Sequence, residues 1–148
     1  MAKKKVLVTG ASGLIGGIGI AVKSADESIR VTGVQSRATP AMYEAFRAGK
    51  LVQCAVVPTL ADGLAGQVDE VSFERARQVV DEMVLVEERS IPAAIRALYH
   101  EGVTGEGSAA VSVAAVLEQV ITVDGPTVVV ITGGNIDAER FAAILSSE

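Results

Sequence analysis

The stretch Val6-Leu7-Val8-Thr9-Gly10-Ala11-Ser12-Gly13-Leu14-Ile15-Gly16 decides the fold of this sequence. Its first three residues are wholly apolar, which is typical of a short strand buried on both faces. Thr9 and Gly10 end that run, and the apolar, glycine-containing residues 14–24 predict a helix. A buried strand that passes through a glycine loop directly into a helix indicates an α/β sheet of parallel strands.

The alternation of strands and helices continues to the end of the sequence. Further strands are predicted at residues 29–34, 83–86 and 127–132, the last being the clearest buried strand, and residues 51–57 are a further extended candidate. The predicted helices are residues 41–48 ended by Gly49, 72–80 capped by Ser72, 91–100 capped by Ser90, 108–120, and 137–145. We therefore predict a single α/β domain, residues 1–148, with an open, mostly parallel sheet and helices on both faces, a Rossmann-like three-layer sandwich.

The composition excludes several classes of function. The sequence has 148 residues, of which 49% are hydrophobic and 21% charged, so we expect a packed domain. The formal net charge is −5 and the only basic cluster is Lys3-Lys4-Lys5, which argues against nucleic acid as a partner. No apolar stretch reaches the ~20 residues that a bilayer requires, so no membrane partner is expected. The single cysteine, Cys54, cannot form an internal disulfide, and we predict a cytoplasmic protein.

Two loops that follow predicted strands are candidate binding elements. In the first, Gly10, Ala11, Ser12 and Gly13 precede Leu14, and the N–H groups at the start of the helix would attract a phosphate-bearing small molecule. The second loop is Thr132-Gly133-Gly134-Asn135, in which the Thr132 hydroxyl could bond to a ring nitrogen. Ligands bind at the carboxyl ends of strands in open parallel sheets. The structural alternatives are glycines chosen for close packing in the first loop and an ordinary turn in the second.

Glu106 is the third candidate, because it is a charge directly before an otherwise apolar predicted helix. As a binding residue, its carboxylate would face the ligand. As a structural residue, it would interact favourably with the positive end of the helix dipole. No cluster of histidine, cysteine or acidic residues predicts a metal site.

Six motifs carry a family resemblance: Gly13-Leu-Ile-Gly-Gly-Ile-Gly-Ile-Ala-Val-Lys23, Val31-Thr-Gly-Val-Gln35, Pro40-Ala-Met-Tyr43, Thr59-Leu-Ala-Asp-Gly-Leu-Ala-Gly66, Glu106-Gly-Ser-Ala-Ala110 and Thr132-Gly-Gly-Asn-Ile-Asp137. In this order they resemble the C-terminal part of the threonine/serine dehydratases, which are fold-type II pyridoxal-phosphate enzymes. The resemblance covers about residues 13–148.

The resemblance implies pyridoxal phosphate as the cofactor, bound without a covalent link. The loop before Leu14 would hold the cofactor phosphate, Thr132 would face the pyridine nitrogen, and Glu106 would lie near the ring. That end of the pocket would be shaped by Gly133, Gly134 and Asn135. The parent reaction would remove water from threonine or serine and release ammonia.

The sequence also departs from the family. The lysine that forms the Schiff base belongs to an N-terminal half that we expect this chain to lack, and the lysines at 3, 4, 5, 23 and 50 are outside the family's Ser-x-Lys motif. The family has four glycines where this chain has Gly10-Ala-Ser-Gly13, and Gln35 stands where the family often has an acidic residue of a cation site. We therefore expect no catalytic residue in this chain and no activity of the chain by itself.

Residues 5–16 are in addition similar to the opening strand and loop of the extended short-chain dehydrogenases, which bind NAD or NADP. Arg37, after the second predicted strand, would suit the 2′-phosphate of NADP, but the Tyr-x-x-x-Lys pair of that family is absent. An NAD(P)-binding module and an engineered or truncated scaffold without ligand therefore stay open as alternatives. We also expect a homo-oligomer, because a half-domain would expose apolar surface.

Overall fold

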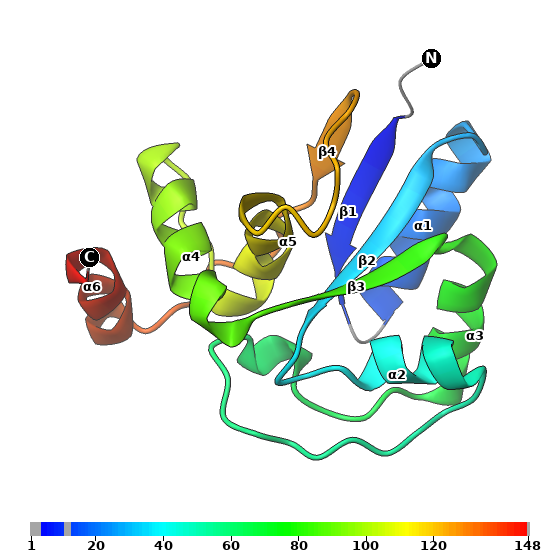
Figure 1. Cartoon of the computed structure of the whole chain (residues 1–148), viewed down its shortest axis with the longest axis horizontal. Coiled ribbons are helices and arrows are strands. Elements are labelled where there is room, and N and C mark those ends of the chain that lie inside the picture. Colours follow the sequence, from blue (N-terminus) through cyan, green and yellow to red (C-terminus); the bar gives the residue numbers. More distant parts are fainter. Residues whose placement is uncertain (1–3, 11–12, 148) are drawn as a thin grey trace.

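Four parallel strands form the centre of the structure, a computed structural model that describes residues 4–10 and 13–147 (Figure 1). Ala11 and Ser12 of the predicted glycine loop lie outside the described residues. The strands are β1 (Lys5–Thr9), β2 (Arg30–Ser36), β3 (Glu82–Val86) and β4 (Thr127–Val129), and their order in the sheet is β3-β2-β1-β4. All three pairings are parallel, which confirms the predicted class of fold.

Helices pack on both faces of this sheet (Figure 1). One face carries α1 (Gly13–Ala25), α2 (Ala41–Ala48) and α3 (Glu70–Val79). The other face carries α5 (Gly107–Leu117), with α4 (Ile91–His100) packed on α5 and α6 (Ala138–Ser146) packed on α4. Two short 3-10 helices, η1 (Asp62–Leu64) and η2 (Glu88–Ser90), lie between these elements. None of the helices in the described ranges is long and apolar enough to cross a membrane.

The apolar run in β1 is explained by its central position. Val6 and Val8 pack with the residues of α1 and α3, and Leu7 packs on the opposite face with α4 and α5. The exposed fractions of Val6, Leu7 and Val8 are 8%, 0% and 0%, because alternate side chains of a strand point to opposite faces and both faces are covered. The opening stretch therefore predicted a buried strand correctly.

The last strand is shorter and more exposed than its sequence suggested. β4 ends at Val129, and its side chains are half-buried or exposed, with Val128 58% exposed. The prediction of a clearly buried strand over residues 127–132 is therefore wrong. The reason is its position, because β4 is at the edge of the sheet and pairs with β1 alone within the described residues.

Local hydrogen bonds correct other predicted boundaries. Asp69, rather than Ser72, caps α3, because its carboxylate accepts hydrogen bonds from Ser72 N at 2.9 Å and Ser72 Oγ at 2.6 Å. Ser90 directly precedes α4, but its side chain makes no capping hydrogen bond. Residues 51–57 form neither strand nor helix, and α5 ends at Leu117 instead of residue 120. Gly49, with φ 67°, ends α2 as predicted.

Candidate functional site

The carboxyl ends of β1 and β4 lie side by side at one edge of the sheet. The pairing runs from Lys5 opposite Thr127 to Leu7 opposite Val129, and Val130 N still donates to Leu7 O at 3.0 Å. The chain then leaves this edge at Gly10 and at Thr132. The structure thus places the two predicted binding loops at the same edge, where open parallel sheets bind ligands.

The glycines of the first loop and of α1 divide into two groups. A Cβ atom on Gly16 would lie 3.0 Å from Arg75 Cβ, and one on Gly19 would lie 2.4 Å from Val79 Cγ2, so these two glycines permit the close packing of α1 on α3. A Cβ on Gly13 or Gly17 would meet no atom within 4 Å. Packing therefore accounts for two of these four glycines, and the first turn of α1 has open space for a ligand.

Gly10, Gly13 and Leu14 lie at the end of β1 and at the start of α1. Gly10 is buried at the end of β1, and Gly13 and Leu14 form the exposed first turn of α1. No acidic residue lies in this turn. The N–H groups at the start of a helix and the positive end of its dipole attract a phosphate group.

A buried hydrogen bond joins this region to α5. Thr9 Oγ1 donates to Ser108 O at 2.9 Å, and Ser108 Oγ accepts from Gly63 N at 2.9 Å. These bonds fix the end of β1 to the first turn of α5 and to η1. The role of Thr9 was not predicted from the sequence, although a polar residue at the end of a buried strand is a signal for such a hydrogen bond.

Glu106 holds the second predicted loop. It is the N-cap residue of α5 but makes no capping bond with its side chain. Instead, Glu106 Oε2 accepts a hydrogen bond from Asn135 N at 3.0 Å, and Glu106 N donates to Gly133 O at 3.3 Å. Gly133 has φ 95°, and a Cβ there would lie 2.5 Å from Glu106 Oε1, so glycine is needed at this position. Glu106 and residues 133–135 therefore form one unit.

This unit borders a pocket of about 350 Å³, lined by Leu60, Asp62, Glu106, Gly107, Asn135, Ile136, Asp137 and Arg140. Three carboxylates and one guanidinium give the lining a net negative charge. An anion is disfavoured there, so the start of α1 remains the better place for a phosphate. Within the described part of the chain, no three histidine, cysteine or acidic side chains are grouped so that they could hold a metal ion.

Glu88 binds the backbone of Leu60, one of the residues that line this pocket, and its role was not predicted from the sequence. Its carboxylate accepts hydrogen bonds from Ser36 Oγ at 2.6 Å, from Thr59 Oγ1 at 2.9 Å and from Leu60 N. These contacts connect the end of β2 to the segment that carries Leu60. Gln35, at the position of the resembled family's acidic residue, is fully buried, and its Oε1 accepts from Tyr43 N at 2.8 Å.

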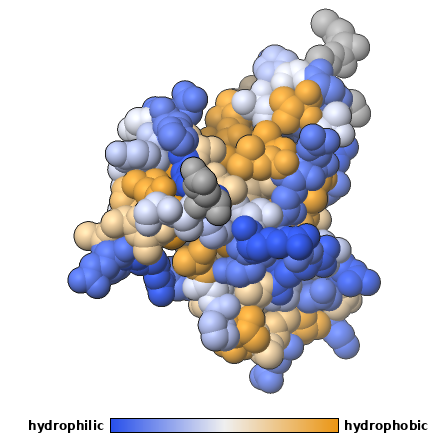
Figure 2. Space-filling model, turned by 60° about the vertical axis from the view of Figure 1, so that its left-hand side comes forward, coloured by the Kyte–Doolittle hydropathy of each residue, from blue (hydrophilic) through white to orange (hydrophobic). Residues whose placement is uncertain are grey.

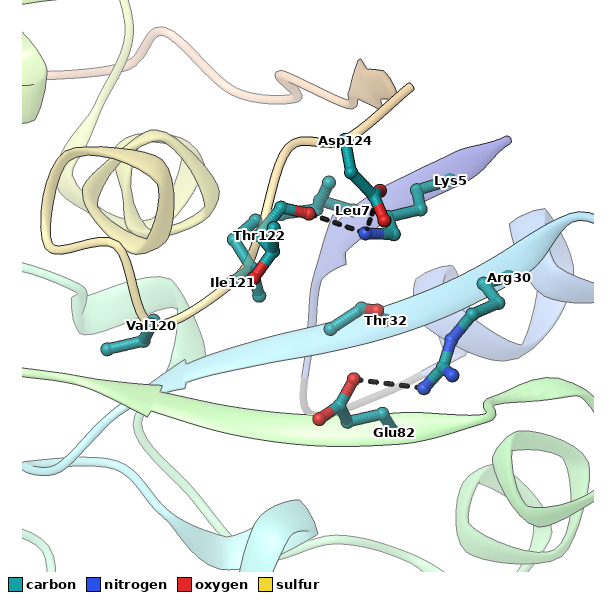
Figure 3. A pocket seen from close by; sticks show the side chains of 9 residues that line it. All are labelled: Lys5, Leu7, Arg30, Thr32, Glu82, Val120, Ile121, Thr122 and Asp124. Carbon is teal, nitrogen blue, oxygen red and sulfur yellow. Dashed lines mark hydrogen bonds and ion pairs between the residues drawn. The ribbon is translucent and has the colours of Figure 1, made fainter. Parts of the chain in front are cut away.

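A larger pocket, of about 520 Å³, lies near the amino ends of the strands (Figure 3). Lys5 and Arg30 line it, but each is paired: Lys5 Nζ lies 2.6 Å from Asp124 Oδ1, and Arg30 lies 3.1 Å from Glu82 Oε2. Because its cations are already neutralised, this pocket offers a phosphate less than the start of α1 does.

The fold and the two loops define an α/β domain with a candidate phosphate-binding edge, and the comparisons identify its family. Residues 4–134 match the family described as "Pyridoxal-phosphate dependent enzyme", and the chain belongs to this family. The match begins at residue 4 and so includes β1, the strand that also resembles the dehydrogenases.

Relatives of the chain within this family include threonine ammonia-lyases and threonine dehydratases. The chain is 38% identical over 143 residues to the L-threonine ammonia-lyase of Thermotoga maritima and 37% identical over 145 residues to the catabolic L-threonine dehydratase TdcB of Escherichia coli. These alignments cover 95% and 94% of this chain but only 36% and 44% of the relatives. The chain therefore spans less than half the length of these two proteins.

Solved structures agree with this assignment. A threonine deaminase from T.th. superposes with a TM-score of 0.84 at 30% identity, over 90% of this chain and 50% of that one. The processed threonine deaminase isoform 2 of Solanum lycopersicum superposes with a TM-score of 0.87 at 29% identity, over 99% of this chain and 45% of that one. The chain thus has the fold of a fold-type II domain similar to threonine dehydratases.

Proposed function

We propose that this chain is the part of a threonine ammonia-lyase type enzyme that holds the phosphate of pyridoxal phosphate, and that it does not turn over threonine or serine by itself. The observation that carries the proposal is the open, uncharged first turn of α1 at the carboxyl edge of the sheet. The names of the relatives support the type of enzyme.

The residues at this edge fit the cofactor. The first turn of α1, with Gly13 and Leu14, offers N–H groups and space for the phosphate. Thr132 is exposed just beyond β4, where its hydroxyl would bond to the pyridine nitrogen, and Glu106 holds residues 133–135 in place beside it. When bound, pyridoxal phosphate supplies an electron sink for a substrate carbanion.

None of the described lysines is among the residues of the proposed cofactor site. Lys4 and Lys5 are at the start of β1, paired with Asp26 and Asp124. Lys23 is in the last turn of α1 and is paired with Asp81, and Lys50 follows α2 and is exposed. Covalent catalysis by the family needs an amine inside the pocket. We therefore expect no release of a 2-oxo acid from threonine or serine, and protein-dependent release with added pyridoxal phosphate would contradict this part of the proposal.

Calorimetric titration tests the binding. Pyridoxine 5′-phosphate is the best probe, because it lacks the aldehyde and cannot form imines with surface lysines. We expect it to bind, and Gly13→Val to weaken binding at least tenfold, which is ~1.4 kcal/mol, because the new side chain fills the space for the phosphate. Gly17→Val is the matched control, since it also has open space but lies a turn further along α1, and it should keep the wild-type affinity. Unchanged affinity in Gly13→Val, or binding of NADP or NAD in place of the pyridoxine phosphate, would refute the proposal.

A further inference from the structure

The pocket of about 520 Å³ in Figure 3 has a floor made by one face of the sheet. The strand pairing places Lys5 beside Arg30 in one row. Leu7, Thr32 and Glu82 form the next row, across β1, β2 and β3. Because alternate residues of a strand point to the same face, these five side chains project from one face of the sheet. The backbone of three paired strands therefore fixes their spacing.

The loop after α5 forms the opposite wall of the pocket. α5 ends at Leu117, and residues 120–122 and Asp124 line the pocket. Lys5 Nζ donates to Thr122 O and lies 2.6 Å from Asp124 Oδ1, so Lys5 joins the floor to this wall. The pocket thus lies between two parts of the chain that direct contacts hold together. It is at the opposite end of the strands from the candidate cofactor edge.

Thr32, in the floor of the pocket, is buried without a hydrogen-bond partner. It is 3% exposed, and its hydroxyl makes no hydrogen bond with another described residue. Val31 and Val34 of the same strand are buried and apolar, and valine at position 32 would fill the same space as threonine. A buried hydroxyl normally has a partner, because burial without one costs free energy. Figure 3 shows Thr32 between the two ion pairs, so a molecule in the pocket can supply this partner.

The charges that line this pocket balance, but their hydrogen-bonding capacity is not used up. Asp124 is paired with Lys5. Glu82 is paired with Arg30, so the lining is neutral as a whole. Arg30 donates through Nη2 to Glu82 Oε2, which leaves Arg30 Nε and Nη1 and Glu82 Oε1 without a hydrogen-bond partner among the described residues. A ligand that carries both a positive and a negative group complements such a lining, because a net charge of either sign would be unbalanced.

We propose that this pocket binds a free α-amino acid in its zwitterionic form. The carboxylate lies between Lys5 and Arg30 and accepts a hydrogen bond from Thr32 Oγ1. The ammonium donates to Glu82 Oε1, since Glu82 is in register with Thr32 on the neighbouring strand. An aliphatic side chain packs on Ile121, which is partly buried against the core.

The size of the pocket and the surface around it fit this class of ligand. Small-molecule pockets typically measure about 300–1,000 Å³, and this one measures about 520 Å³. Figure 2 shows hydrophobic and hydrophilic side chains next to one another at the top of the molecule, where Figure 1 places the start of β1. An amino acid with a charged head and an apolar side chain can contact both kinds of surface. The proposal does not depend on cofactor binding, because the pocket shares no residue with the proposed cofactor site.

Calorimetric titration of the full chain, without added cofactor, tests the proposal with L-valine as the probe. We expect saturable binding of one L-valine per chain. Isovalerate lacks the ammonium group and isobutylamine lacks the carboxylate, but both keep the aliphatic part. Each should bind at least tenfold more weakly, because each leaves one half of the charge pattern in the pocket without a partner.

Thr32→Val is the sharpest variant, because it removes the hydroxyl and keeps the shape of the side chain. It should weaken the binding of L-valine about tenfold, the typical effect of a hydrogen bond to a charged group. Arg30→Gln should weaken this binding at least tenfold. Arg37→Gln is the matched control, since Arg37 directly follows the other end of β2 and is also in an exposed ion pair, with Glu87. It should keep the wild-type affinity, and so should Gly13→Val at the proposed cofactor site.

Each of four results would overturn the proposal. The first is no saturable binding of L-valine to the wild type, and the second is equal affinity for L-valine and isovalerate. The third is unchanged affinity in Thr32→Val while the circular dichroism spectrum stays that of the wild type. The fourth is loss of L-valine binding in Gly13→Val but not in Thr32→Val, because the amino acid would then bind at the candidate cofactor edge.

Discussion

Replacement of Gly19 in α1 by alanine should destabilise the protein, although the same change normally stabilises a helix. Alanine is favoured over glycine in a helix interior by about 0.8–1.0 kcal/mol. At Gly19, however, the new Cβ would lie 2.4 Å from Val79 Cγ2 and 3.0 Å from Val79 Cβ, so α1 and α3 must separate. Overpacking of this kind costs about 1–3 kcal/mol, and we expect a net loss of about 1–2 kcal/mol in the free energy of unfolding.

Gly17→Ala is the control for this prediction, because a Cβ there meets no atom within 4 Å. It should raise the free energy of unfolding by about 1 kcal/mol. Urea denaturation followed by circular dichroism, at equal protein concentrations, measures both changes. In a Val79→Ala background, which removes the contacted Cγ2 but keeps Cβ, Gly19→Ala should destabilise the protein less than it does in the wild type. If Gly19→Ala were as stabilising as Gly17→Ala in the wild-type background, the close contact of α1 and α3 would be refuted.

Three further predictions concern the site and its support. Thr9→Val should lower the free energy of unfolding by about 1 kcal/mol in urea denaturation, because it removes the buried bond to Ser108 O without changing the side-chain shape, and an unchanged value would contradict that bond. Glu106→Ala should speed hydrogen exchange at the Asn135 amide at least tenfold, because it removes the acceptor of that amide. Glu106→Gln keeps an acceptor oxygen and should have a smaller effect. Equal exchange rates in the wild type and both variants would refute the contact. Hydrogen bonds from the side chain of Ser72, and to a lesser extent from its backbone, lower the pKa of Asp69 in the folded protein. The stabilisation that the Asp69 carboxylate provides is therefore complete above its pKa in the unfolded chain, about 3.9, and is lost as pH falls through its lower pKa in the folded protein. The stability difference between wild type and Asp69→Ala should therefore shrink as pH falls below ~4, and a difference independent of pH would contradict this assignment.

The class of fold could be predicted because hydrophobic periodicity and the glycine loop are local signals. The run Val6–Val8 is apolar because both faces of β1 are covered, and Gly49 ends α2 because its backbone is left-handed. The exposure of β4 could not be predicted in this way, since an apolar run does not reveal whether a strand has one neighbour or two. The cap of α3 was misplaced for a related reason, because both Asp69 and Ser72 are good capping residues and only their geometry distinguishes them.

The two loops of the candidate site could be predicted from the sequence, but the hydrogen bonds that join them to other segments could not. The two loops follow strands, so their common edge follows from parallel topology. The bond from Glu106 to Asn135 N and the network around Glu88 join residues that are far apart in the sequence, and no local pattern indicates such pairs.

Mapping of backbone amide chemical shifts during addition of pyridoxine 5′-phosphate tests the account most directly. If the start of α1 holds the cofactor phosphate, the amides of Gly13 and Leu14 and those of residues 133–135 should shift together and saturate with one affinity. The amides of Lys5 and Arg30, around the pocket in Figure 3, should remain unchanged. Shifts confined to Lys5 and Arg30, or no saturable shift at Gly13 and Leu14, would contradict the proposed cofactor site.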